Sequence, residues 1–551
     1  MSKIERREIK NLLLELVRQS SISNTDEAKL MSNKIVKILK DIKYFKENPT
    51  NLFVQKLKDD PLEREFIAAL LKGNNNSNKT VVLMGHYDVV GIEDYGQDKE
   101  LAFQPLKLTE KIINQDFNNL PAEVKEDIRT GDYLFGRGVS DMKGGQAVQI
   151  ALIKYFSKHL DELPGNILFL SLPDEETSSR GAINSVSFLN KLKKERNLDY
   201  QAIIDSEPMV PKYPGDNKKY IYTGSAGKSV VFFYSIGIET HATNIFSGLN
   251  SNLLASQIVN SLEGNMDYSE QIKPDLITSP PSCLKLRDEK ELYSASIPKK
   301  TIAYFNMPVL TTDPKTMLKK LTKLTEKSCK KAMKKIDKNK KKFDKLSNID
   351  HQPSDNKVNV LTYKELYKQA YQKVGDSLDD KIKEVYTENK NKLQQQDIAL
   401  KIVDKVNSIA DDDNPKVIIG YLPPYYPSIL NKEKSKGDKR INNTAQKVIE
   451  KYRKEYGKDM EICKSFLGIS DLSYYKLMDF KKVKNYLEPN MPDWGLDYKL
   501  PLDDMNELDI PIMNLGVYGK ASHKHYERIE QNFSFGVLPE LLKEAVLDLL
   551  Q

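Results

Sequence analysis

Cysteine is scarce in this chain of 551 residues, and the three that occur, Cys283, Cys329 and Cys463, are far apart. None forms a Cys-x-x-Cys pair, which argues against a disulfide framework and against a thiolate-bound zinc ion. Long apolar runs are also missing, since no segment approaches the roughly 20 residues that a membrane span needs. The charged N-terminus has no apolar signal-peptide core. We therefore expect a cytoplasmic protein with no membrane partner.

Arginine is the next scarce residue, with only 12 among the 85 basic residues. Residues 315–345 hold 14 lysines against three acids, and they carry an apolar stripe with helical spacing. Nucleic-acid recognition favours arginine, and a lysine run on one helix is most often a solvated face. We therefore expect no nucleic-acid partner, although a lysine-rich helix that binds nucleic acid is the rival interpretation.

The length of the chain predicts two or three domains. Up to about residue 210, short apolar strands alternate with amphipathic helices, as in 80–84, 145–159, 166–172 and 201–204. This alternation predicts an α/β domain whose mixed, mostly parallel sheet is flanked by helices and carries its ligands at the strand ends.

The middle of the chain has a different pattern of strand, helix, two strands and helix, which predicts an inserted α+β lid domain. We expect the catalytic domain to comprise residues 1–218 and 411–551. The lid would comprise residues 219–375, and residues 376–410 would form a helical extension or linker. Residues 417–421 are expected to be a buried strand of the catalytic domain, and no role follows for the polar helices of 363–410.

Polar residues follow several of the predicted strands. His86 and Asp88 are two residues apart and point the same way on an extended chain, so the carboxylate could orient a metal-bound imidazole. Asp141 lies in a glycine-rich loop and could bridge two cations. Each feature has a plainer interpretation, a strand-end histidine for the first and a tight turn with a helix cap for the second.

Further acids and histidines follow the other strands. Glu175 and Glu176 could divide metal binding and proton transfer between them, or simply stabilise a helix N-terminus. Asp205 ends another strand, and His523 and His525 follow the last one. Each signal is weak alone, but together they form a nitrogen and oxygen ligand set suited to zinc or a similar divalent ion.

The order and spacing of these motifs resemble the co-catalytic zinc peptidases and deacylases. That family includes aminoacylase, acetylornithine deacetylase, succinyl-diaminopimelate desuccinylase and glutamate carboxypeptidase. The chain is most similar to its arginine-utilisation, RocB-like branch. The resemblance covers nearly the whole chain and includes a lid histidine, His241, followed by a matching Asn250.

The resemblance implies two divalent metal ions, most simply Zn²⁺, with Mn²⁺ or Co²⁺ as alternatives. One ion would take His86, Asp141 and Asp205, and the other Asp141, Glu176 and His523. Glu175 would be the general base for a metal-bound water, Asp88 would orient His86, and His241 would polarise the scissile carbonyl. His523 is preferred to His525 because Glu527 follows it at the family's spacing. The resemblance also implies a cis peptide bond after Asp141 and a homodimer formed through the lid.

One position departs from the family pattern. Asn306 stands where relatives carry a lid arginine that reaches the substrate carboxylate. Lys228 or Arg528 could substitute for that arginine, and Asn250 is a further candidate for substrate binding.

The sequence thus predicts a two-metal hydrolase that cleaves an amide or peptide bond in a small molecule, such as an N-acyl amino acid or a short peptide. The RocB-like resemblance places it in amino-acid catabolism, with arginine as a candidate. The alternative is a catalytically inactive binding or regulatory homologue, which metal content and amide turnover would distinguish.

Overall fold

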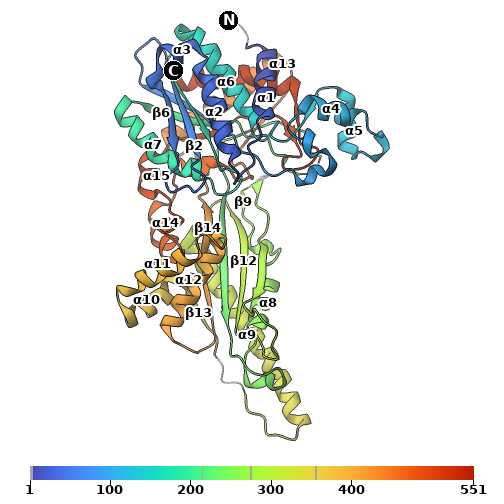
Figure 1. The fold of residues 1–551 in the computed structure, drawn as a ribbon, viewed down its shortest axis with the longest axis vertical. Coiled ribbons are helices and arrows are strands. Elements are labelled where there is room, and N and C mark those ends of the chain that lie inside the picture. Colours follow the sequence, from blue (N-terminus) through green and yellow to red (C-terminus); the bar gives the residue numbers. More distant parts are fainter. Residues whose placement is uncertain (1–3, 214, 273–275, 354–356) are drawn as a thin grey trace. The chain divides into compact units, whose positions relative to one another are not determined.

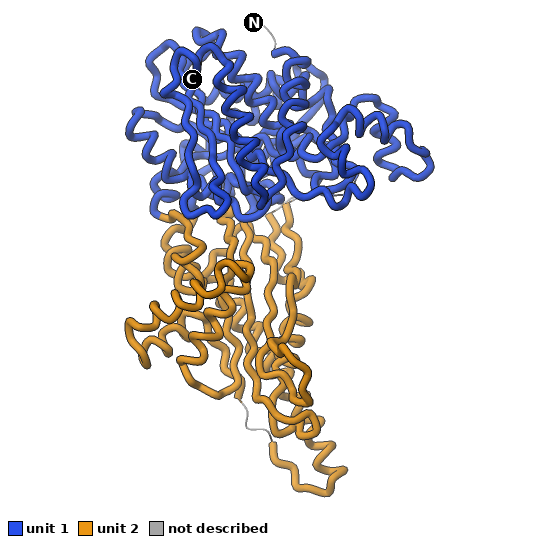
Figure 2. Tube along the Cα trace, viewed as in Figure 1, with its two compact units in different colours: residues 1–226, 429–477, 503–551 blue, residues 227–428, 478–502 orange. Residues whose placement is uncertain are grey.

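A computed structural model describes residues 4–213, 215–272, 276–353 and 357–551, and divides the chain into two compact units (Figures 1 and 2). Unit 1 comprises Met1–Ala226, Ile429–Leu477 and Asp503–Gln551, and unit 2 comprises Gly227–Ser428 and Met478–Leu502. No helix within the described ranges is long and apolar enough to cross a membrane.

An eight-stranded sheet forms the centre of unit 1, in the order β1-β2-β5-β3-β6-β16-β7-β15. The four adjacent strands β5, β3, β6 and β16 run parallel, and antiparallel pairs flank them. The strands are β1 (Leu52–Lys56), β2 (Glu65–Lys72), β3 (Lys79–His86), β5 (Asn166–Leu172), β6 (Asp199–Asp205), β7 (Tyr220–Tyr222), β15 (Glu461–Cys463) and β16 (Ile512–Asn514). Every residue of β5 is buried, as expected for a strand covered on both faces. This confirms the predicted mixed, mostly parallel sheet.

Amphipathic helices flank this sheet. They include α1 (Arg6–Arg18), α2 (Glu27–Lys40), α6 (Lys143–Lys158), α7 (Arg180–Arg196), α13 (Lys436–Tyr456) and α17 (Leu538–Leu550). Helix α13 shows why they form. Its buried residues Ile441, Ala445, Val448 and Tyr452 recur every three or four positions, and the Ser435 side chain caps its N-terminus. A small sheet, β17-β18-β4, joins Gly519–Lys520, Arg528–Glu530 and Tyr133–Phe135.

Unit 2 is built on a five-stranded sheet in the order β11-β12-β8-β14-β13. The strands are β8 (Gly227–Ile236), β11 (Ser282–Asp288), β12 (Lys300–Val309), β13 (Asn359–Thr362) and β14 (Lys416–Tyr426). Helices α8 (Ser251–Leu262) and the 33-residue α9 (Pro314–Leu346) pack against each other and against strands of this sheet. The predicted α+β insertion is therefore present.

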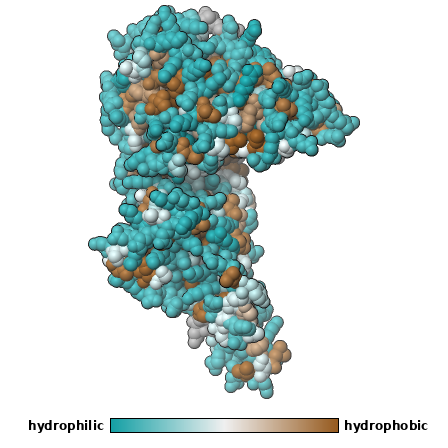
Figure 3. Space-filling view, in the orientation of Figure 1, coloured by the Kyte–Doolittle hydropathy of each residue, from teal (hydrophilic) through white to brown (hydrophobic). Residues whose placement is uncertain are grey.

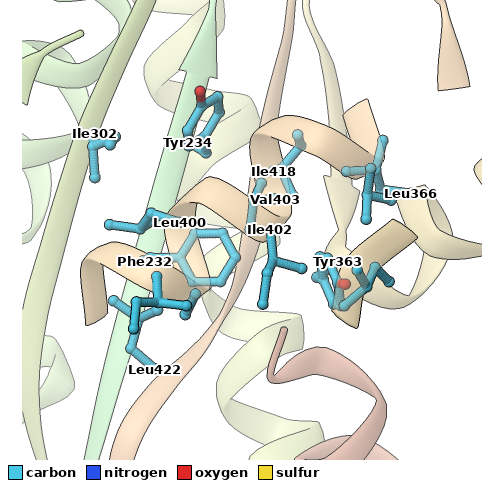
Figure 4. Close-up of a cluster of buried hydrophobic side chains, with 14 of the residues drawn as sticks. Phe232, Tyr234, Ile302, Tyr363, Leu366, Leu400, Ile402, Val403, Ile418 and Leu422 are labelled. Carbon is cyan, nitrogen blue, oxygen red and sulfur yellow. The ribbon is translucent and has the colours of Figure 1, made fainter. Parts of the chain in front are cut away.

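Unit 2 also contains the consecutive helices α10 (Tyr363–Val374), α11 (Ser377–Asn389) and α12 (Gln395–Ala410), and the short α14 (Phe480–Tyr486). Figure 4 shows Leu400, Ile402 and Val403 of α12 directed toward Phe232 of β8 and Ile418 of β14, with Tyr363 and Leu366 of α10 beside them. These helices, whose role the sequence left open, therefore share a hydrophobic core with the lid sheet.

This packing corrects the predicted domain boundaries. The sequence pattern places residues 411–428 in the catalytic domain, but β14 pairs antiparallel with β8 along most of its length and belongs to the lid sheet. Residues 478–502 also belong to unit 2, and residues 376–410 are part of it rather than a separate extension. Strand β14 is mostly apolar and is buried at all but one position, so its sequence does not reveal which of the two sheets it joins.

The surface gives little further guidance. On the face that Figure 3 shows, apolar residues are scattered within a mostly hydrophilic surface. Among the described residues, the most exposed large apolar side chains belong to unit 2 and include Leu292, Tyr293 and Leu346.

Candidate metal and active site

Segments that follow the parallel strands of unit 1 bring its chemically active side chains together. His86 is the last residue of β3, Glu175 and Glu176 follow β5, and Glu207 follows β6. Parallel strands end at one edge of a sheet, which is where such folds bind their ligands. The cluster therefore arises directly from the order of the strands.

A first group of potential metal ligands consists of His86, Asp141 and Glu207. The Nε2 atom of His86 lies 3.2 Å from Oδ1 of Asp141 and 3.2 Å from Oε1 of Glu207. All three side chains are buried. Burial alone would lower the pKa of His86, but the Glu207, Asp141 and Asp88 carboxylates raise it well above its ordinary value.

A second group consists of Asp141, Glu176 and His523, so Asp141 is common to both. The Nε2 atom of His523 lies 3.0 Å from Oδ2 of Asp141 and 3.0 Å from Oε2 of Glu176. Hydrogen bonds to these two carboxylates raise the pKa of His523 to about 10. The two oxygens of Asp141 thus face different imidazoles, as a carboxylate shared by two cations requires.

The donor atoms fit divalent metal ions. Imidazole nitrogen and carboxylate oxygen are ligands that zinc and similar ions accept, and a buried cluster of acids is costly without a compensating cation. In addition, Oε1 of Glu176 is buried and has no hydrogen-bond partner within the described part of the chain. As predicted from the sequence, the structure brings together His86, Asp141, Glu176 and His523.

Glu175 lies beside both groups. Its Oε2 atom is 3.9 Å from Nε2 of His86, and the side chain is largely buried. Burial raises the pKa of Glu175 well above its ordinary value, although His86 acts in the opposite direction. A carboxylate with a raised pKa next to a cation site suits proton transfer near neutral pH.

Asp88 positions the loop that carries the two glutamates. Its carboxylate accepts hydrogen bonds from the backbone N–H groups of Glu175 and Glu176, at 3.1 and 3.3 Å, and from the Ser23 hydroxyl at 2.6 Å. The Nδ1 atom of His86 lies closer to the backbone oxygen of Asp88, at 3.0 Å, than to the carboxylate, at 3.6 Å. The backbone oxygen of Asp88 therefore holds the His86 ring, and its carboxylate holds the Glu175 loop. That the carboxylate orients His86 stays a prediction.

Glu527 holds the loop around Asp141. Its Oε1 atom accepts hydrogen bonds from the backbone N–H groups of Ser140 and Asp141, at 3.2 and 3.3 Å. Its Oε2 atom pairs with Arg137 at 2.8 Å. The peptide bond between Asp141 and Met142 is cis, as the resemblance implied.

Asp205 does not join either ligand group, which corrects the sequence prediction. Its Oδ1 atom accepts the backbone N–H of Ser206 at 2.8 Å, and its Oδ2 atom accepts the Ser470 hydroxyl at 3.1 Å. Glu207, two residues further on, reaches His86 instead. The sequence does contain this signal, because residues 205–208 read Asp-Ser-Glu-Pro and offer two acids at the end of one strand.

The structure also corrects the prediction that Arg528 binds the substrate. The side chain is fully buried and pairs with Asp127, whose Oδ2 atom lies 2.7 Å from Nε and 2.6 Å from Nη2 of Arg528. A guanidinium committed to a buried carboxylate is not available to a substrate. His525 lies apart from the ligand groups, 3.5 Å from Asp98 and stacked on Tyr526.

The remaining candidates lie in unit 2. His241 is exposed, and its Nδ1 atom lies 2.7 Å from the Thr243 hydroxyl. Asn250 caps α8 by accepting the N–H of Asn252. Lys228 is in β8, with its Nζ atom 5.9 Å from the centre of the Tyr426 ring. None of the three belongs to a ligand group, and their part in substrate binding stays a prediction.

The fold and the clustered ligands are those of a metallopeptidase-type hydrolase. The profile of the family described as "Peptidase family M20/M25/M40" matches residues 82–490, and the chain belongs to this family. Two Bacillus subtilis (strain 168) proteins are similar along almost the whole chain. "Uncharacterized protein YqjN" is 35% identical over 99% of this chain and 96% of its own length, and "Protein RocB" is 33% identical over 98% and 95%. The RocB-like resemblance is thereby confirmed.

Solved structures agree on the fold. A tripeptidase from Staphylococcus aureus has a TM-score of 0.54 at 14% identity and covers 100% of both chains. A metallo-carboxypeptidase of the M20 family from Sulfolobus solfataricus has a TM-score of 0.52 at 15% identity, covering 98% of this chain and 99% of its own.

Proposed function

We propose that this hydrolase uses two divalent metal ions to cleave an amide or peptide bond in a small substrate, such as an N-acyl amino acid or a short peptide. The observation that carries the proposal is the pair of ligand groups that share Asp141, with Glu175 beside them. In this proposal His86, Asp141 and Glu207 hold one ion, and Asp141, Glu176 and His523 hold the other. Zn²⁺ suits this nitrogen and oxygen set best, with Mn²⁺ and Co²⁺ as alternatives.

The bound ions would supply Lewis acidity, which polarises the substrate carbonyl and makes water a stronger nucleophile. Glu175 takes a proton from the attacking water and delivers it to the leaving amine. Asp88 fixes the Glu175 loop through two backbone N–H groups, so the carboxylate keeps a constant position during this transfer. His241 donates a hydrogen bond to the carbonyl oxygen as negative charge develops there.

We also propose that two copies associate through the lid. Strand β11 is an edge of the five-stranded sheet, and its Leu284 and Leu286 side chains are 55% and 49% exposed. An exposed edge strand with apolar side chains is prone to pair with a second copy. Light scattering of the wild type and of Leu284→Lys should then give a dimer and a monomer, respectively.

Amino-acid catabolism is the proposed context, supported by the similarity to RocB. The decisive experiment is a hydrolysis screen over N-acyl amino acids, arginine derivatives included, and dipeptides, each with added Zn²⁺, Mn²⁺ or Co²⁺. We expect metal-dependent turnover of at least one substrate class. Metal binding without any amide turnover would contradict the proposal and favour an inactive binding homologue.

A further inference from the structure

A large groove within unit 2 has no part in the proposed hydrolysis. Its volume is about 1080 Å³, slightly above the range of roughly 300–1,000 Å³ that is typical of small-molecule sites. Three walls enclose it, formed by the start of α9, by α10 with α11, and by the segment 486–496. None of its lining residues belongs to a metal-ligand group.

Two lysine pairs border this groove. Lys315 and Lys319 are one turn apart on α9, and Lys364 and Lys368 are one turn apart on α10. Residues four apart on a helix share a face, so each helix presents two ammonium groups to the same space. Among the described residues, no carboxylate lies within 4.0 Å of any of these four ammonium groups. These ammonium groups are therefore available to an anionic ligand.

Three carboxylates also line the groove, so its four lysines leave a net charge of about +1. Glu365 is engaged at the start of α10, where it accepts hydrogen bonds from the backbone N–H and the hydroxyl of Thr362. Asp379 accepts the Tyr367 hydroxyl at 2.6 Å. Two of the three lining carboxylates are thus committed to neighbours within the fold, and Glu488 is the third.

Aromatic side chains form much of the remaining wall. Tyr363 lies at the buried base, and the rings of Tyr367 and Tyr371 stack with centroids 6.3 Å apart and an angle of 16°. Tyr486 and Trp494 line the opposite segment, and Nζ of Lys315 lies 5.1 Å from the centre of the Tyr486 ring. Such a wall favours flat rings, which stack on aromatic faces.

We propose that this groove binds a small molecule that joins a flat aromatic ring to a phosphate or carboxylate group. The ring would stack against the tyrosine and tryptophan side chains, and the anionic group would pair with the lysines of α9 and α10. Lysine ammonium groups pair with a phosphate and with a carboxylate alike, so one probe of each kind is needed to tell which anionic group binds.

The chain provides its own reporter, because Trp494 is the one tryptophan in the sequence and lines the groove. Its emission is followed in the intact wild-type protein during titration with adenosine 5′-monophosphate and, separately, with benzoate. Adenosine supplies a ring without charge, and inorganic phosphate supplies charge without a ring. Isothermal calorimetry with the same four probes gives a readout that does not depend on Trp494.

We expect saturable binding of adenosine 5′-monophosphate or benzoate, with both partial probes binding at least about tenfold more weakly. Lys364→Gln combined with Lys368→Gln should weaken the binding by about tenfold or more. The matched control combines Lys330→Gln and Lys334→Gln, an exposed pair four residues apart on α9 that does not line the groove. This control should bind as the wild type does.

Three results would overturn the proposal. The first is that neither adenosine 5′-monophosphate nor benzoate binds saturably, by fluorescence or by calorimetry. The second is unchanged affinity in the Lys364/Lys368 variant, and the third is an equal loss in the control pair. All variants replace exposed lysines, so the fold should persist, and none is a residue of the proposed hydrolytic site.

Discussion

Glu207 lies with its Oε1 atom 3.2 Å from Nε2 of His86, whereas both carboxylate oxygens of Asp205, two residues earlier, are engaged by Ser206 and Ser470. The two acids leave the same strand but have different partners. Only one of them is therefore placed to bind a metal ion.

Replacing Glu207 and Asp205 separately should distinguish these roles. Glu207→Ala removes a ligand and should lose about one equivalent of metal per chain, together with most of the activity. Asp205→Asn keeps a hydrogen-bonding group of the same shape and should retain both metals. Elemental analysis of protein purified without chelators measures the metal content of both variants. Metal loss in Asp205→Asn with full metal content in Glu207→Ala would show that Asp205 is the ligand instead.

Glu175→Gln should retain its metal content but reduce turnover by a factor of at least about 10², because the amide cannot accept the proton. Metal analysis and steady-state kinetics on the best substrate measure the two effects on one preparation. Near-normal turnover would mean that another group moves the proton.

His523 and His525 should respond differently to replacement by alanine. His523 contacts Asp141 and Glu176, so His523→Ala should lose about one equivalent of metal and nearly all activity. His525 packs against Tyr526 and faces Asp98, so His525→Ala should keep both metals. The reverse pattern would move the ligand to His525.

His241→Ala should reduce turnover by roughly 10² to 10³, the cost of losing one oxyanion donor, and leave metal content unchanged. His351→Ala is the matched control, because His351 is also in unit 2 and pairs with Asp344 at 2.9 Å. That variant should keep wild-type turnover.

Mixing subunits tests whether His241 acts across a dimer. Randomly mixed His241→Ala and Glu175→Gln chains form heterodimers in half of the dimers. If His241 acts on the site of its partner chain, each heterodimer contains one intact site. Roughly a quarter of wild-type activity should then return. If His241 serves its own chain, the mixture should stay as inactive as its components.

Asp493 should make the stability of unit 2 depend on pH. Burial raises the pKa of Asp493 to about 8, and neither carboxylate oxygen has a hydrogen-bond partner in the described structure. Because the folded pKa exceeds the unfolded value, the unfolded chain releases this proton first. Stability should therefore fall as the pH rises from about 4 to about 8, and then level off.

Asp493→Asn should reduce that decline and stabilise unit 2 at neutral pH. The emission of the adjacent Trp494 reports on unfolding of this unit, and urea titrations at pH 5 and pH 8 give the comparison. Asp497→Asn, an incompletely buried acid of the same segment, is the control and should keep most of the decline, because burial is the main cause of the raised pKa of Asp493 and the charge of Asp497 adds less. An unchanged pH dependence in Asp493→Asn would show that other groups cause it.

Much of the site could be predicted because its residues lie beside strands with clear patterns. The apolar runs that became β3, β5 and β6 end next to His86, Glu175 and Asp205, and parallel pairing brings these ends together. The choice between Asp205 and Glu207 depended on where the strand ends within two residues, which a sequence pattern does not resolve.

Other features depend on tertiary packing that no local pattern encodes. Strand β14 is buried along its length, and only pairing with β8 shows that it belongs to the lid. The sequence makes Arg528 a candidate for substrate binding, and only the tertiary structure shows that its side chain is buried against Asp127. The groove of unit 2 combines residues of α9 and α10 with the segment 486–496, which lies more than a hundred positions after α10.

Unit 1 is assembled from three separate stretches of chain, so the ribosome synthesises its proposed metal ligands at different times. His86, Asp141 and Glu207 all belong to the first stretch, so a ribosome completes that group before unit 2 has been made. His523 comes from the last stretch and closes the second group only near the end of synthesis. A chain that ends before His523 therefore carries all the ligands proposed for one ion but lacks one of the ligands proposed for the other.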